Sequence, residues 1–85
     1  MTKLPPRSLK TIAQEIISDI EAGVWSKSSA FYAAPYLVAM RELDKITDKY
    51  LLDSGRSIVL YFLSNASTWR GETARRIKLE LKGML

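Results

Sequence analysis

The chain has 85 residues, which suffices for one domain, and 47% of them are hydrophobic. That content argues against disorder and leaves apolar side chains for a homo-oligomer or a partner interface. The chain contains neither cysteine nor histidine, which excludes Ser-His and Cys-His catalytic pairs and removes the usual ligands of zinc. Any acid or base would have to be Asp, Glu, Lys or Tyr. We therefore expect a protein that is not an enzyme and needs no cofactor.

The setting predicted from composition is the cytoplasm, because small secreted domains usually rely on disulfides. No apolar run approaches the roughly 18 residues that a membrane span needs, so we expect no membrane contact. The segment Met1–Arg7 contains Pro5-Pro6 and lacks the apolar stretch of a signal peptide. It is predicted to be a loose lead-in to a single domain covering residues 1–85.

The first predicted helix runs from about Leu9 to Ala22, with Ser8 as its N-cap and Gly23 just past its end. Its apolar residues recur at helical spacing: Leu9, Ile12, Ala13, Ile16, Ile17 and Ile20. A second helix is predicted from about Pro35 to Tyr50, because Pro35 suits a first helical position. Its apolar stripe consists of Tyr36, Leu37, Met40, Leu43 and Ile46.

The segment Ile58–Leu63 is apolar throughout, so periodicity alone does not separate a buried helix from a buried strand. Its β-branched and aromatic residues favour a strand. No other segment offers a strand partner, so we predict a helix over about Gly55–Ala66. The strand interpretation holds only if two chains pair through this segment.

A last helix is predicted from about Thr68 to Lys82, ended by Gly83. The short connections favour neighbouring antiparallel helices. The predicted fold class is therefore all-α, a compact bundle of about four helices.

The net charge of +4 is concentrated near the C-terminus, since residues 54–85 carry six basic and two acidic groups. Within the last helix, Leu79 falls on the polar side, and its neighbours at helical spacing are basic: Arg75, Arg76, Lys78 and Lys82. An exposed leucine ringed by cations is typical of a docking point for an acidic partner with an apolar centre. The simpler interpretation is a scattered surface leucine, which is common.

Two further features have a structural and a functional interpretation. Trp69 and Arg70 could present a ring and a guanidinium to a partner, although a tryptophan at a helix start more often packs into the core. Asp44 and Asp48 are four residues apart and could hold Mg²⁺ through water, as in a metal-dependent hydrolase. Interleaved Lys45 and Lys49 favour a solvated charged face instead, so no metal site is predicted.

The C-terminal part contains the stretch Asp53–Lys78, which reads DSGRSIVLYFLSNASTWRGETARRIK. Over about Ala34 to Leu85 the chain resembles short uncharacterised reading frames of bacteriophages and prophages. The resemblance carries no activity and assigns no functional residue. It implies a phage-type accessory protein acting inside a bacterial host cell.

The leading hypothesis is a small accessory protein that binds a host or phage protein, as an inhibitor or modulator, through its basic C-terminal helix. The second is weak, non-specific nucleic-acid binding through phosphate contacts, since the basic face lacks Asn or Gln for base recognition. The candidate residues are Trp69, Arg70, Arg75, Arg76, Lys78, Leu79 and Lys82, and the nucleic-acid hypothesis uses only the five basic ones.

Overall fold

Helices form most of the fold in the computed structural model, which describes residues 5–85. Residues 5–85 contain five α-helices: α1 (Leu9–Glu21), α2 (Lys27–Ala30), α3 (Ala34–Met40), α4 (Gly55–Ser64) and α5 (Glu72–Met84). A single 3-10 turn, η1 (Phe31–Ala33), joins α2 to α3. Two short strands, β1 (Lys49–Tyr50) and β2 (Asp53–Ser54), pair as an antiparallel hairpin. The mostly helical, compact fold is confirmed, whereas a purely all-α class is wrong because of the hairpin.

The first helix follows its sequence signals closely. The Ser8 hydroxyl accepts the backbone N–H of Thr11 at 3.1 Å, which satisfies one of the free donors at the start of α1. Four residues of the predicted apolar stripe are buried (Leu9, Ile12, Ala13 and Ile16), and the other two, Ile17 and Ile20, are partly buried. Before α1, Pro5–Arg7 form no helix or strand, and the rest of the expected lead-in lies outside the described residues.

The predicted helix over Pro35–Tyr50 is wrong beyond Met40, where α3 ends. The carbonyl oxygens of Leu43 and Asp44 accept the backbone N–H groups of Lys10 and Leu9, at 2.9 and 3.0 Å. Those carbonyls therefore accept hydrogen bonds from the free N–H groups at the start of α1, and they do not take part in a continuing helix. Burial of Leu43 preserves the apolar pattern although the backbone has left the helix.

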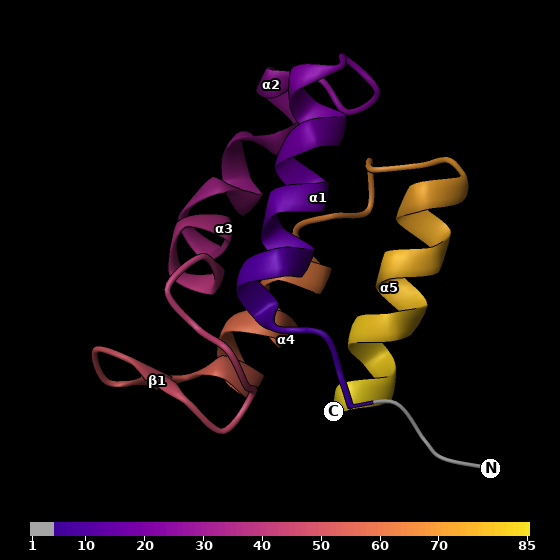
Figure 1. The fold of residues 1–85 in the computed structure, drawn as a ribbon. Coiled ribbons are helices and arrows are strands. Elements are labelled where there is room, and N and C mark those ends of the chain that lie inside the picture. The colour runs from indigo at the N-terminus through magenta and orange to yellow at the C-terminus, as the bar shows by residue number, and fades with distance from the viewer. Residues whose placement is uncertain (1–4) are drawn as a thin grey trace, which may run out of the picture.

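The hairpin places two leucines at its tip. Tyr50 pairs with Asp53, so Leu51 and Leu52 form a two-residue turn and are 83% and 96% exposed. Leu51 has a φ of 59°, a left-handed conformation that costs a non-glycine residue roughly 1–2 kcal/mol. The hairpin extends away from the helices at one edge of the molecule (Figure 1).

The segment Ile58–Leu63 is helical, so the helix interpretation is confirmed. It lies in α4, which starts at Gly55 with the Ser54 hydroxyl accepting the N–H of Ser57 at 3.2 Å. A Cβ at Gly55 would lie 2.8 Å from the Cα of Ile46, so the loop before the hairpin passes directly over the start of the helix. The helix ends at Ser64, slightly earlier than predicted.

A tryptophan pair forms the centre of the core. Trp25 stacks on Trp69 with ring centroids 5.4 Å apart, and Phe62 packs its edge against both rings. Both indole N–H groups are satisfied, since Trp25 donates to Thr68 Oγ1 at 3.1 Å and Trp69 to Asp19 Oδ2 at 3.0 Å. The extended connection that holds Trp69 in the core delays the start of α5 to Glu72, later than the predicted Thr68.

The helices pack around this core in a flattened molecule, with principal extents of 35 × 35 × 18 Å. In Figure 1, α1 lies between α3 on one side and α5 on the other, and α4 lies behind α1. Within residues 5–85, no helix combines the length and apolar character that crossing a membrane requires.

Candidate functional site

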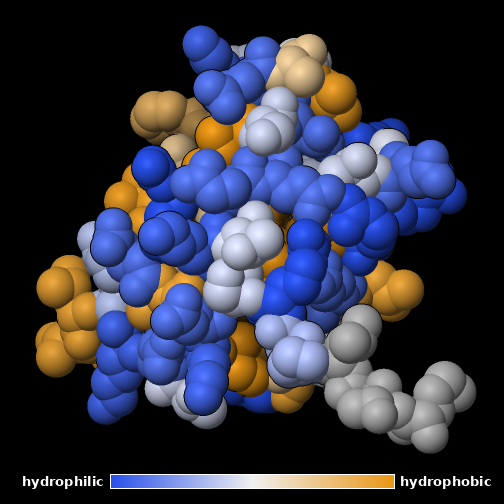
Figure 2. All heavy atoms as spheres, viewed as in Figure 1, coloured by the Kyte–Doolittle hydropathy of each residue, from blue (hydrophilic) through white to orange (hydrophobic). Residues whose placement is uncertain are grey.

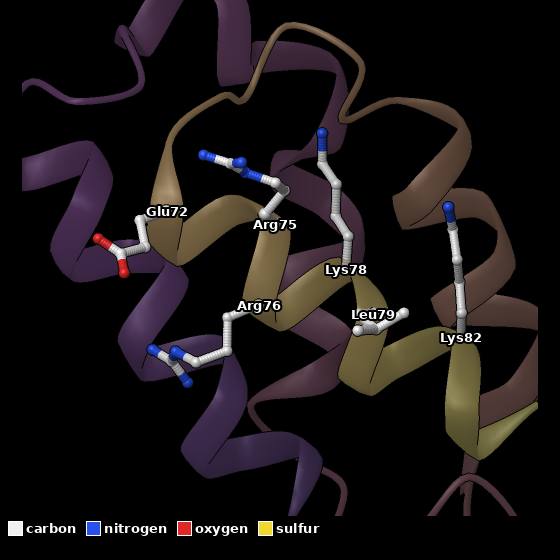
Figure 3. A pocket seen from close by; sticks show the side chains of 6 residues that line it. All are labelled: Glu72, Arg75, Arg76, Lys78, Leu79 and Lys82. Atoms are coloured by element: carbon white, nitrogen blue, oxygen red, sulfur yellow. The ribbon is translucent and has the colours of Figure 1, made fainter.

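The outer face of α5 carries the exposed leucine that the sequence singled out. The helix turns Ala74, Ile77 and Leu81 into the core, and Leu79 on the other side is 73% exposed. A shallow hollow is lined by Glu72, Arg75, Arg76, Lys78, Leu79 and Lys82 (Figure 3). The structure therefore gathers five of the seven predicted site residues around one depression.

The side chains around this hollow point in two directions. Arg75, Lys78 and Lys82 extend to one side of α5 and flank Leu79, whereas Arg76 and Glu72 point toward the opposite side (Figure 3). We call the group Arg75, Lys78, Leu79 and Lys82 the Leu79 surface. It combines an apolar centre with cations on one side of it.

Arg76 is engaged within the protein. Its guanidinium forms an ion pair with Glu15 of α1. Arg76 therefore links α5 to α1, and the Glu15 carboxylate largely compensates its positive charge.

Arg7 extends this network from the segment before α1. Its guanidinium makes two parallel hydrogen bonds to Glu80, at 2.7 and 2.9 Å, and a third to Glu15 at 2.9 Å. Hydrogen bonds from Arg76 hold the pKa of Glu15 below its usual 4.5, and those from Arg7 do the same for the pKa of Glu80. Arg7 thus joins the start of the domain to its last helix, which the expectation of a loose lead-in did not anticipate.

Lys78 is partly withdrawn from the surface. Its ammonium donates to the backbone carbonyl of Trp69 at 2.6 Å and lies 5.9 Å from the centre of that ring. Burial lowers the pKa of Lys78, and the neighbouring charges of Lys82 and Arg70 lower it further. This lysine therefore supports the connection before α5 as well as lining the hollow.

Among the candidate site residues, three cations keep their charge available to a partner. Within residues 5–85, no carboxylate lies within 4 Å of the basic groups of Arg70, Arg75 or Lys82. Arg70 is exposed, but the Trp69 ring beside it is fully buried and cannot meet a partner in this conformation. The candidate surface thus consists of Leu79 and its cations, and Trp69 supports it from inside.

The two aspartates considered for a metal do not share a helix face. Asp48 Oδ2 accepts the backbone N–H groups of Lys45 and Asp44, at 2.9 and 3.1 Å, and so closes a turn. These hydrogen bonds hold the pKa of Asp48 below its usual value of 3.8. Across the described part of the chain, residues 5–85, no group of three or more potential metal ligands comes together.

The sequence alone did not reveal the Arg7–Glu15–Glu80 network. Glu15 lies on the polar face of α1, and its partner Arg76 is 61 residues away. No local spacing reports a contact of that separation, so only the fold reveals which cations are engaged.

The chain matches no protein-family model, no curated protein and no solved structure. What bears on the function is therefore the geometry of the Leu79 surface itself.

Proposed function

We propose that this protein is a non-enzymatic binding protein that docks an acidic partner protein on the Leu79 surface. The observation that carries the proposal is an exposed leucine flanked by cations, of which Arg75 and Lys82 have no carboxylate in reach within residues 5–85. A partner helix with one apolar side chain among carboxylates would complement it in shape and in charge.

The expected affinity is modest. Burying a leucine side chain contributes roughly 1.5–3 kcal/mol, and each exposed ion pair at the rim contributes about 0.2–1 kcal/mol. Association also costs translational and rotational entropy, which offsets much of this gain. The Leu79 surface alone therefore supports a dissociation constant in the micromolar range or weaker. Its positive charge chiefly increases the association rate and makes that rate sensitive to salt.

Leu79 favours a protein over a nucleic acid as the partner. A phosphate backbone would use Arg70, Arg75 and Lys82 but would gain nothing from an apolar centre. Because Arg76 and Lys78 are engaged internally, at most about three phosphate contacts remain, giving a log–log salt slope of roughly −3 on duplex DNA.

The biological setting that we propose follows from the resemblance to phage reading frames alone. In that setting the protein acts in the cytoplasm of a bacterial host as an accessory protein, and its partner is an acidic host or phage protein that it inhibits or modulates.

The test uses a defined probe, a fluorescent helical peptide with glutamates on both sides of a leucine stripe. Leu79→Asp should weaken its binding by about tenfold or more, because the substitution removes the apolar contact and adds a like charge. A duplex DNA of similar charge is the competing probe, and preferential binding of the DNA would favour the nucleic-acid hypothesis.

The matched control is Lys27→Glu, since Lys27 is an exposed cation on α2, away from α5. It lowers the net charge by two, as does Arg75→Glu. We expect Arg75→Glu to weaken peptide binding about tenfold and Lys27→Glu to change it less than about twofold. Equal losses in both variants would show attraction to net charge rather than docking on the Leu79 surface.

A further inference from the structure

The surface formed by α3 and α4 has an unusual charge pattern. The stretches 28–40 and 57–69 contain no Lys, Arg, Asp or Glu. They include most of α3 and α4, which pack against each other more extensively than any other pair of elements. The outer side of a surface helix normally carries polar and charged residues, and hydrophilic side chains cover the α1 and α5 side of the molecule (Figure 2). Apart from Arg56 at the start of α4, these two helices carry no charge, and they meet on one side of a protein that is otherwise rich in charge.

Aromatic side chains occupy this uncharged surface. Tyr36 of α3 stacks on Tyr61 of α4, with ring centroids 5.7 Å apart and planes 18° apart. Tyr32 lies one helical turn before Tyr36, and its ring contacts Phe31 edge-on at 5.5 Å. Phe31 is 68% exposed and Tyr32 72%, and Leu60 beside Tyr61 is also exposed. We call these five residues, Phe31, Tyr32, Tyr36, Leu60 and Tyr61, the aromatic face.

The aromatic face offers enough apolar surface for the core of a protein–protein contact. Since each large aromatic side chain buries about 150–250 Å², the exposed parts of these residues together offer roughly 500 Å² of mostly apolar surface. A standard interface buries about 800 Å² on each partner, with a core rich in tyrosine and depleted in charge around which polar residues form the rim. The face supplies such a core, and uncharged residues of the two stretches, such as Ser64, supply rim positions.

We propose that the aromatic face is the contact between two copies of this chain in a symmetric dimer. An acidic partner would gain no charge pairing on an uncharged face, whereas a second copy offers the same uncharged aromatic surface, which is the self-complementarity that two-fold contacts need. Each copy carries a net charge of +4, so association is favoured where the contacting surfaces are neutral. In Figure 1, α3 and α5 lie on opposite sides of α1, so contact along α3 leaves the Leu79 surfaces exposed.

Sedimentation velocity of the full chain over a concentration series tests this contact. We expect a monomer–dimer equilibrium with a dissociation constant between about 1 and 100 µM. Tyr32→Asp places a charge on each side of the contact and should weaken dimerisation by at least about tenfold. Far-UV circular dichroism checks that the variant remains folded, which we expect because Tyr32 is mostly exposed.

A second variant and a control separate the alternatives. Leu60→Asp, at an exposed position on the other helix of the face, should weaken the dimer as Tyr32→Asp does. Arg75→Glu on α5 should leave the dissociation constant unchanged. A wild-type protein that is monomeric throughout the series would overturn the proposal, as would a dimer that survives both aspartate substitutions or dissociates with Arg75→Glu. Docking on the Leu79 surface would be unaffected by that failure.

Discussion

The hydrogen bond between Asp19 and Trp69 predicts a measurable loss of stability when it is removed. The Trp69 side chain is fully buried, and its indole N–H donates to the Asp19 carboxylate at 3.0 Å. Asp19→Ala leaves this buried donor unsatisfied, which costs about 1–3 kcal/mol. A carboxylate near the C-terminal end of a helix is itself unfavourable by roughly 0.3–1 kcal/mol, and the alanine variant recovers that amount. Taking the middle of each range, the expected net loss is about 1.4 kcal/mol.

Thermal unfolding followed by circular dichroism measures this loss. For a domain of this size, 1 kcal/mol corresponds to roughly 4–8 °C in Tm, so Asp19→Ala should lower the Tm by about 6–11 °C. Near-ultraviolet circular dichroism should change as well, because Trp69 stacks on Trp25. Asp19→Asn keeps an acceptor oxygen and should retain most of the stability. A wild-type Tm in the alanine variant, or equal losses in both variants, would refute the hydrogen bond as the cause.

Three further substitutions test separate parts of the fold by the same unfolding assays. Leu51→Gly should raise stability by up to about 1 kcal/mol, because glycine adopts positive φ without strain and Leu51 packs little; no gain would contradict that strain. Gly55→Ala should lower stability by about 1–3 kcal/mol, because the added methyl group would clash with the backbone of Ile46. The control Gly83→Ala should not lower it, since the space around Gly83 is open. Equal effects of the two substitutions would contradict the close approach of the Ile46 backbone to Gly55. The pKa of the Glu15 carboxyl is lowered below 4.5 in the folded protein, so its contribution to stability is present above the unfolded pKa and is lost as pH falls through the folded pKa. Glu15→Gln should therefore flatten the fall of stability with decreasing pH below about pH 5. An unchanged pH dependence in this variant would contradict the ion pair.

Local sequence signals were sufficient for α1 but not for α4. In α1, apolar spacing and the Ser8 cap agree, and no tertiary contact opposes them. In α4, the choice of helix rested on the lack of a strand partner, and the short hairpin does not supply one to Ile58–Leu63. The early end of α3 was not predictable, because Leu43 keeps helical spacing while its carbonyl bonds to the distant Lys10.

The candidate site was predictable in outline only. Helical spacing placed Leu79 opposite the core stripe of α5, and the structure exposes it. The same spacing gave Arg75, Arg76 and Lys78 equal weight, although Arg76 pairs with Glu15 and Lys78 binds the Trp69 carbonyl. These contacts join residues that the fold brings together, so spacing along one helix contains no information about them.

The most direct test of docking on the Leu79 surface is a charge-swap titration. Arg75→Glu with Lys82→Glu should abolish binding of the glutamate-bearing leucine peptide and create binding of a matched peptide in which lysines replace the glutamates. Each exposed pair contributes little alone, so the double variant gives the clearer reversal, about tenfold or more in each direction. Undiminished binding of the acidic peptide by this double variant would contradict the account.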